Sequence, residues 1–489
     1  MERFANLIDG QEVAPVEGRY LPTENPWTGL PFAEIPRSSP ADVDAAVAAA
    51  ERAFRTSKWA TMSATERAGL MRKLGDLVER EAENLAVAET RDNGKTFSEM
   101  FRQMRNTAEW YRYYGGLADK IEGRVIPVEA PGHLNYTIRE PLGVIAMIIP
   151  WNSPVRLLAW KLAPALAAGN TCVIKPSEFA TTSTLTFARL VKEAGIPDGV
   201  VNVVSGLGAE IGPALTDHPD VAKVAFTGGV GSGTAVYVAA AKRLRPATLE
   251  LGGKSPNIVF EDADIESAVN GVLAGIFASG GQSCVAGSRL LVADSVHDDF
   301  VARLAAAAEK IRLGDPMDPK THVGPVANRP QFERIMGMIE AAKAEGARLV
   351  CGGTAVTGAE GGLFVTPTIF ADVAPDMTIV RDEVFGPVLV VLRFKNEDEA
   401  VAMANDSRFG LGAGIWSQDA GRVHRMAAKV RAGSVWVNTY RMTSQTSPFG
   451  GYDLSGVGRE GGQAMIDAYL QTKSVWVNTT GRYASAFPA

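Results

Sequence analysis

The middle of the chain alternates short apolar runs with segments of helical periodicity. Five runs, each of a length that suits a buried strand, cover residues 144–149, 171–174, 200–204, 221–226 and 247–251. Between them, residues 157–168, 184–194 and 234–243 carry apolar side chains at helical spacing. Strands separated by helices predict a parallel sheet with right-handed crossovers, the architecture on which nucleotides bind.

The flanking patterns extend this α/β prediction. Helical spacing continues through residues 42–54, 65–88 and 97–114, and two strands are predicted at residues 123–128 and 134–138. A second alternating set at residues 289–292, 348–351, 388–394 and 434–438 predicts a second α/β domain. A chain of 489 residues also exceeds what one hydrophobic core usually covers.

Composition and charge exclude several classes of protein. The net charge is −6 and no Lys/Arg-rich block occurs, so we expect no nucleic-acid partner. The longest strongly apolar run, residues 142–149, is too short to cross a bilayer, and the N-terminus has no apolar signal region. Three cysteines indicate the reducing cytoplasm, and five scattered histidines predict no metal site.

Cys284 and Glu250 are the strongest candidates for chemistry. Cys284 follows Gly281-Gln282-Ser283, and Glu250 precedes Leu251-Gly252-Gly253. A thiolate adds readily to a carbonyl, and a carboxylate can take a proton from the water that releases the product. The pair predicts aldehyde oxidation through a thioester, although Cys284 taken alone could be a small buried thiol.

Three further segments follow predicted strands. Asn152 could donate to an oxyanion together with the Cys284 N–H, or simply cap the helix that opens at Pro154. Lys175, Ser177 and Glu178 could hold an adenosine ribose, or form a solvated turn. The glycine-rich turn from Phe226 to Gly233 could approach a pyrophosphate, or be plain structure.

Taken together, the motifs resemble the NAD(P)-dependent aldehyde dehydrogenase superfamily, and within it the bacterial DhaS-like group. The resemblance covers nearly the whole chain. It is carried, in order, by Pro-Trp-Asn-x-Pro, Lys-Pro-Ser-Glu, Phe-Thr-Gly, Glu-Leu-Gly-Gly-Lys, Gly-Gln-x-Cys, Glu-x-Phe-Gly-Pro and Pro-Phe-Gly-Gly. It implies an α/β fold with a Rossmann-like NAD-binding domain (residues 1–118 and 142–250), an α/β catalytic domain (251–450) and a small β oligomerisation arm (119–141 and 469–489).

The resemblance also implies roles for individual residues. Cys284 is the nucleophile, Asn152 an oxyanion donor, Glu250 the base for deacylation, and Lys161 a lysine near the active site unless it is an ordinary helix-face lysine. NAD, with NADP possible, would be held by Trp151, Lys175, Ser177, Glu178, Phe226, Thr227, Gly228, Gly229, Gly233, Leu251, Gly252, Glu383 and Phe385. An aldehyde would meet Ser153, Arg156, Leu157, Trp160, Ser283, Arg441 and Phe449. A homodimer or homotetramer is expected by analogy.

Some positions depart from the family pattern. Ser153 stands where an aromatic residue is common, and Arg156 and Arg441 are unusual where they stand. We hypothesise a bulky or anionic aldehyde, aromatic or a semialdehyde. Equally, these arginines could lie at the solvent rim and serve the surface or an oligomer contact. Gly229 lacks a hydroxyl that many relatives offer to the pyrophosphate. Glu178 favours NAD because a carboxylate repels a 2′-phosphate.

Three other functions stay open at this point. A CoA-acylating semialdehyde dehydrogenase shares the thiol, but Glu250 suits deacylation by water. An esterase would need no nicotinamide, and the cofactor motifs argue against it. A non-catalytic scaffold protein would have no need to keep Cys284, Glu250 and Asn152 together.

Overall fold

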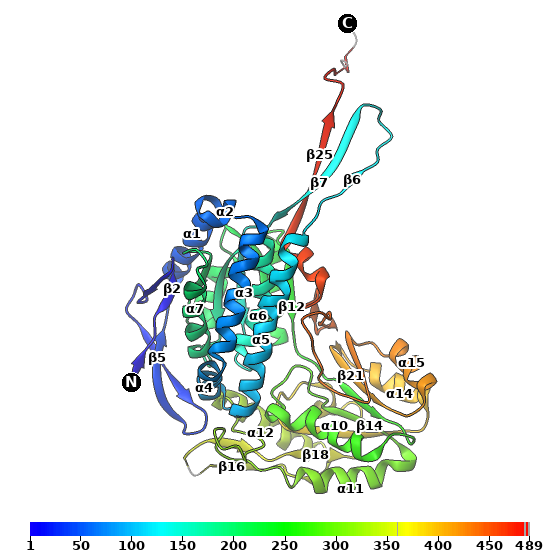
Figure 1. Cartoon of the computed structure of the whole chain (residues 1–489). Helices are drawn as coiled ribbons and strands as arrows, with labels where there is room; N and C mark the ends of the chain where they lie inside the picture. Colours follow the sequence, from blue (N-terminus) through cyan, green and yellow to red (C-terminus); the bar gives the residue numbers. More distant parts are fainter. Residues whose placement is uncertain (359, 484–485, 488–489) are drawn as a thin grey trace.

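The computed structural model describes residues 1–358, 360–483 and 486–487, which form two large sheets and a projecting arm (Figure 1). The first sheet has 8 strands, in the order β24 (Gly456–Val457), β12 (Ala247–Glu250), β11 (Val221–Thr227), β8 (Val144–Ile149), β9 (Thr171–Pro176), β10 (Val201–Val203), β2 (Asn6–Ile8) and β3 (Gln11–Val13). The central strands from β12 to β10 are parallel, and the outer ones pair antiparallel. The predicted parallel sheet is confirmed.

Helices cover both faces of this sheet because alternate residues of its strands are apolar on both sides. Val144 and Ala146 of β8 join one buried cluster with α1 (Pro40–Thr56) and α8 (Gly208–Thr216), and α9 (Val230–Lys242) lies beside α8. Ile145 and Met147 join the other, which also includes residues of α6 (Pro154–Ala168) and α7 (Thr182–Ala194). A further layer of α3 (Ala64–Arg80), α4 (Ala82–Asn93) and α5 (Phe97–Leu117) packs over α6 and α7, and α2 (Lys58–Thr61) follows α1.

Two predictions for the first hundred residues need correction. The single helix at residues 65–88 is wrong, because Glu81 leaves the helical conformation (φ −93°, ψ 13°) and separates α3 from α4. The apolar pattern continues across the break because both helices bury their faces in the same cluster. The strands β1 (Glu2–Arg3), β2, β3, β4 (Tyr20–Asn25) and β5 (Leu30–Pro36) were not predicted, since they are short and rich in proline and charge.

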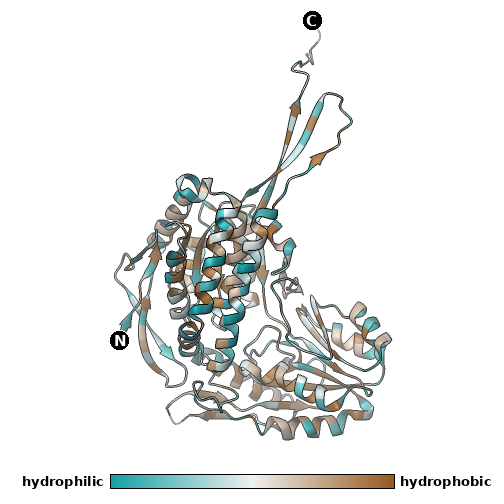
Figure 2. Cartoon of the chain, viewed as in Figure 1, coloured by the Kyte–Doolittle hydropathy of each residue, from teal (hydrophilic) through white to brown (hydrophobic). Residues whose placement is uncertain are grey.

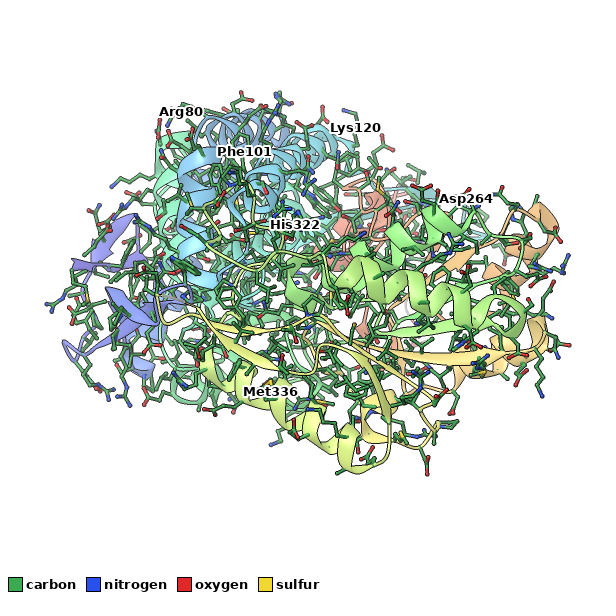
Figure 3. All side chains as sticks on the ribbon, turned by 90° about the horizontal axis from the view of Figure 1, so that it is seen from below. Arg80, Phe101, Lys120, Asp264, His322 and Met336 are labelled. Atoms are coloured by element: carbon green, nitrogen blue, oxygen red, sulfur yellow. The ribbon has the colours of Figure 1, made fainter. Side chains whose placement is uncertain are left out.

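The second sheet has 7 strands, in the order β15 (Arg348–Cys351), β18 (Thr368–Ala371), β19 (Val388–Phe394), β14 (Arg289–Ala293), β13 (Pro256–Val259), β21 (Gly412–Trp416) and β22 (Ser434–Val437). Around it lie α10 (Ile265–Phe277), α11 (His297–Ala308), α12 (Arg329–Ala344), α13 (Thr378–Arg381), α14 (Glu397–Asn405) and α15 (Ala420–Lys429), and the hairpin β16 (Ala355–Thr357) with β17 (Leu363–Val365). Asp264, labelled in Figure 3, caps α10 by accepting the Ser267 N–H at 2.8 Å.

All four strands predicted for this region are present within a residue of their expected ends, as β14, β15, β19 and β22. The prediction omitted β13, β18 and β21. Two of these have only four residues, and β21 contains two glycines that weaken a strand pattern.

The arm consists of β6 (Val125–Ile126), β7 (His133–Pro141) and β25 (Leu470–Asn478), and projects away from both sheets (Figure 1). Apolar residues lie along its strands (Figure 2), and several are exposed, among them Val125 (74%) and Trp476 (58%). The predicted strands 123–128 and 134–138 both fall in the arm. Among the described residues, no helix is long and apolar enough to span a membrane.

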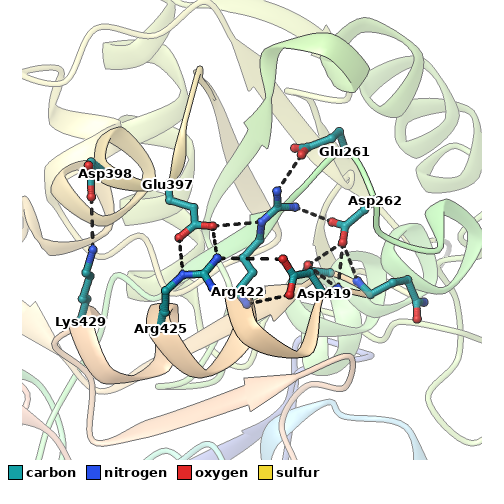
Figure 4. Close-up of polar contacts among 10 residues, drawn as sticks. Glu261, Asp262, Glu397, Asp398, Asp419, Arg422, Arg425 and Lys429 are labelled. Carbon is teal, nitrogen blue, oxygen red and sulfur yellow. Dashed lines mark hydrogen bonds and ion pairs between the residues drawn. The ribbon is translucent and has the colours of Figure 1, made fainter.

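Arg422 links α15 to α14 and to the loop after β13 through ion pairs (Figure 4). Its guanidinium, on α15, pairs with Glu261 at 2.9 Å and Asp262 at 2.7 Å, just after β13, and with Glu397 of α14 at 3.3 Å. It also lies 4.5 Å from the centroid of the Phe260 ring. Its side chain is only 17% exposed, so this network is less screened than an isolated surface pair.

We expect Arg422→Ala to lower the free energy of unfolding by about 2 kcal/mol, because it leaves three carboxylates without their shared cation. Arg303→Ala is the matched control, since it removes an exposed pair with Asp299 and should cost about 0.5 kcal/mol or less. Calorimetric unfolding of both variants measures the difference. Equal losses would show that the network adds nothing beyond an ordinary surface pair.

Candidate active site

Cys284 lies in a tight turn between α10 and β14. The turn begins with Ser279 and Gly280, both left-handed at φ 59° and 60°, inside the short helix η2 (Ala278–Gly281). A Cβ on Gly281 would lie 2.0 Å from the Gly386 carbonyl oxygen, so only glycine fits there. The thiol lines a cavity of about 500 Å³ that Asn152 and Glu250 also line.

Asn152 and Glu250 reach this cavity from neighbouring parts of the first sheet. Asn152 follows β8, and its side-chain amide donates to the Gln282 carbonyl at 3.2 Å. Glu250 ends β12 and is 1% exposed, and apart from an interaction with the Cys284 thiol neither carboxylate oxygen has a hydrogen-bond partner among the described residues. Parallel strands end at the same edge of a sheet, so Asn152 and Glu250 lie at one edge of the first sheet, and the turn next to the second sheet brings Cys284 to it.

Two N–H groups near the thiol, one from the Asn152 amide and one from the Cys284 backbone, have no acceptor among the described residues. The Asn152 amide has a second N–H beyond the one given to Gln282. Among the residues that the structure describes, no acceptor pairs with the Cys284 backbone N–H. Such donors are what an oxyanion at a carbonyl attacked by Cys284 would require.

Burial sets the electrostatics of the pair. It raises the pKa of Glu250 to about 7, because the carboxylate is removed from water. It also raises the pKa of the Cys284 thiol well above its ordinary value, and the nearby charge of Glu250 adds to the effect. In this arrangement the proton resides on sulfur, and Glu250 titrates near neutrality.

The predicted cofactor residues gather around two adjoining cavities. The second, of about 640 Å³, is lined by Lys175, Ser177, Glu178 and Phe226. Both cavities are lined by Trp151, Thr227, Gly228 and Gly229, and Leu251, Gly252, Glu383 and Phe385 line the first. All of the predicted cofactor residues except Gly233 line one cavity or the other.

Local contacts explain several of these positions. Lys175 pairs with Glu178 at 3.3 Å, and the Gly208 N–H donates to Glu178 at 3.4 Å. Gly229 precedes the N-terminus of α9 without a side-chain cap, which leaves backbone N–H groups facing the cavity rim. Gly233 serves packing, since a Cβ there would lie 2.4 Å from a Leu251 methyl carbon.

Glu383 reaches across from the second sheet to the glycine turn after Glu250. Its carboxylate accepts the Gly253 N–H at 3.0 Å, and a Cβ on Gly252 would lie 2.1 Å from it. Burial raises the pKa of Glu383 to about 7. The loop that carries Glu383 also places Phe385 at 5.3 Å from Trp151, ring centroid to centroid.

Lys161 forms a fully buried ion pair with Glu460, a residue that the sequence did not single out. The two side chains are 0% and 1% exposed, and both act electrostatically on Glu250. The alternative of an ordinary helix-face lysine is therefore wrong, because Lys161 faces the protein interior.

The predicted substrate residues are arranged differently from the cofactor residues. Only Leu157 lines the 500 Å³ cavity. Leu157, Trp160 and Phe449 belong to the aromatic and apolar cluster against which Cys284 packs, and the rings of Trp160 and Phe449 are 5.1 Å apart. Ser153 is buried, Ser283 is half-buried, and Arg156 lies 5.5 Å from the Trp160 ring.

Sequence reasoning missed a set of polar residues beneath Asn152. The Asn93 amide donates to the Asn152 carbonyl at 3.4 Å, and Lys95 Nζ donates to Ser153 Oγ at 3.1 Å. The Val155 N–H donates to Glu89 at 3.3 Å, and burial raises the pKa of Glu89 to about 8. The run Asn93-Gly94-Lys95 after a predicted helix was the available signal.

We expect Glu250→Gln to speed alkylation of Cys284 by iodoacetamide at pH 7, by about 3- to 10-fold. The negative charge of Glu250 raises the pKa of the thiol, so its removal lowers that pKa and increases the thiolate fraction. Peptide mass spectrometry measures the rate, with Cys284→Ala giving the background from Cys172 and Cys351. A slower rate in Glu250→Gln would mean that Glu250 activates the thiol as a base.

Comparisons with known proteins show the family of the chain. The model of the aldehyde dehydrogenase family matches residues 13–475. The chain is 47% identical over 93% of its length to the (Z)-2-((N-methylformamido)methylene)-5-hydroxybutyrolactone dehydrogenase of Acinetobacter baylyi, and 43% identical over 96% to DhaS of Bacillus subtilis, covering 93% and 95% of those chains. The NAD+ complex of an aldehyde dehydrogenase from Bacillus cereus superimposes with a TM-score of 0.96 at 45% identity, covering 98% of this chain and 97% of that one. The chain belongs to the aldehyde dehydrogenase family, whose reaction is the NAD-dependent oxidation of aldehydes.

Proposed function

We propose that Cys284, Asn152 and Glu250 carry the oxidation of an aldehyde to a carboxylic acid. The observation that supports this most is their convergence on one cavity from two different sheets. Once the Cys284 thiol has lost its proton to solvent, the thiolate sulfur adds to the carbonyl carbon, and the carbonyl oxygen becomes an oxyanion. The second N–H of the Asn152 amide and the Cys284 backbone N–H donate to that oxyanion.

The residues around the adjoining cavities suit a dinucleotide. Glu178 and Lys175 would hold the adenosine ribose, the N-terminus of α9 at Gly229 would face the pyrophosphate, and Glu383 would hold the second ribose. Bound NAD supplies the hydride acceptor for the oxidation. Trp151, which lines both cavities, lies against the ring of Phe385, which lines the first.

Glu250 completes the reaction after oxidation has left a thioester on Cys284. Its buried carboxylate, with a pKa of about 7, is matched to taking a proton from water at neutral pH. The water oxygen then adds to the thioester carbon, the C–S bond breaks, and the acid leaves. The buried pair of Lys161 and Glu460 tunes the charge of Glu250. Glu250 thus favours water over CoA as the acyl acceptor.

We further propose a preference for NAD over NADP. Glu178 lies where the adenosine ribose would bind, and its carboxylate would repel a 2′-phosphate. The Lys175 ammonium is already paired with Glu178, so it offers a phosphate little compensation.

The arm supports a homodimer or homotetramer, because exposed apolar residues such as Val125 and Trp476 need cover. The cysteines Cys172, Cys284 and Cys351 are free thiols, which suits the reducing cytoplasm.

NADH formation at 340 nm (a property of the cofactor), followed with NAD over a panel of aldehydes, tests the assignment. Cys284→Ala should abolish the signal, and Asn152→Ala should lower kcat by about 10²- to 10³-fold through loss of one oxyanion donor. Arg303→Ala, distant from the site, is the control. Gly233→Ala is not suitable, since a side chain there disturbs packing. Turnover that survives in Cys284→Ala would refute the proposed nucleophile.

A further inference from the structure

Three basic side chains from separate elements lie close enough to Cys284 or to one another to interact electrostatically. Lys95 follows α4, Arg156 lies in the first turn of α6, and Arg441 follows β22. Lys95 contacts Ser153 Oγ at 3.1 Å, and Arg156 donates to Thr443 Oγ1 at 2.5 Å. The charges of Arg156 and Arg441 both act on the Cys284 thiol, and each acts on Lys95.

Neutral groups, and no carboxylate, hold these cations in place. Arg441 donates to Ser279 Oγ at 3.0 Å and to the Ala278 and Ala274 carbonyls at 3.2 and 3.3 Å. Among the described residues, no carboxylate oxygen lies within 4.0 Å of a charged nitrogen of Lys95, Arg156 or Arg441.

Two acidic residues lie nearby, and only Glu99 offsets part of the positive charge. Glu89 has a pKa of about 8 because it is buried, so it is largely protonated at neutral pH. Burial alone would raise the pKa of Glu99, but the charges of Lys95 and Arg441 outweigh it and lower that pKa. Glu99 accepts the Ser279 hydroxyl, which links it to Arg441 only through that serine. One carboxylate therefore faces the guanidiniums of Arg156 and Arg441 and the Lys95 amine, whose own pKa burial lowers.

The backbone also fixes this arrangement. Arg441 is left-handed at φ 61°, a conformation that costs a non-glycine residue about 1 kcal/mol or more. The Arg156 guanidinium lies over the Trp160 ring, and Trp160 contacts Phe449 in the cluster that packs against Cys284. The Arg156 guanidinium thus borders the aromatic surface that packs against Cys284.

We propose that Lys95, Arg156 and Arg441 form an anion subsite, and that the aldehyde oxidised at Cys284 carries a carboxylate, as in a semialdehyde. This inference rests on the proposed function of Cys284. Arg156 is the main ligand, because its guanidinium has a single hydrogen-bond partner among the described residues and retains donors for a planar carboxylate. Arg441 and Lys95 contribute charge and fix the subsite. Ser153, in place of a larger side chain, leaves room for Lys95 to approach.

Matched pairs of aldehydes test the subsite in the full-length enzyme with NAD. The pairs are 4-formylbenzoate with 4-formylbenzamide, and 4-oxobutanoate with 4-oxobutanamide, which differ in charge and hardly in size. For at least one pair, wild type should favour the carboxylate by about 10-fold or more in kcat/KM. Arg156→Leu should lower that ratio by about 10- to 100-fold, and Arg156→Lys by less. Arg105→Leu, on the exposed side of α5, should keep the wild-type ratio.

A measurement on the wild type alone guards against misfolded variants. Benzoate should compete with benzaldehyde, while benzamide at the same concentration should not. The subsite would be overturned if the wild-type ratio of kcat/KM for carboxylate over amide were near one for both pairs and benzoate and benzamide inhibited equally. Cys284-dependent oxidation of neutral aldehydes would then still support the proposed function. Absence of Cys284-dependent oxidation with every aldehyde would instead overturn the proposed function, and the subsite with it.

Discussion

In a parallel sheet every strand ends at the same edge, and this constraint organises the site. At that edge β8 leads to Asn152, β9 ends beside Lys175, β11 ends at Thr227 and β12 ends at Glu250. The second sheet then needs to supply only the Cys284 turn and the Glu383 loop. Burial follows from the same geometry, because the edge is covered by the second sheet, and it raises the pKa of Glu250 to about 7. Topology, burial and acid–base chemistry therefore have one physical origin.

The two sides of Cys284 differ in chemistry. Towards the cofactor cavities lie backbone N–H groups, glycines and carboxylates suited to a dinucleotide. Away from them lie an aromatic cluster and the three cations at Lys95, Arg156 and Arg441. In the proposed function, the first side holds the NAD that the reaction of the family requires. The second side carries the residues, such as Ser153 and Arg156, that set this chain apart from the family pattern, so substrate choice is expected to reside there.

The sequence allowed the central strands, the site residues at their ends and the arm to be predicted, because short apolar runs and turn motifs are local signals. It did not reveal the break at Glu81, since both helices share one apolar face. The partner of Lys161 was also hidden, because Glu460 is distant in the chain and approaches only through tertiary packing. Likewise, the position of Arg441 near Lys95 depends on left-handed backbone at Ser279 and Arg441. No residue pattern predicts this backbone conformation. The division into domains at the expected boundaries stays a prediction.

The central claim is that Cys284 forms a thioester which Glu250-activated water then hydrolyses. Intact-protein mass spectrometry of Glu250→Gln, mixed with NAD and a good aldehyde and quenched in acid within seconds, tests it most directly. The account predicts one acyl group per subunit, located on Cys284 by peptide mapping and absent without NAD. An unmodified Cys284 under conditions in which one equivalent of NADH has formed would contradict the account.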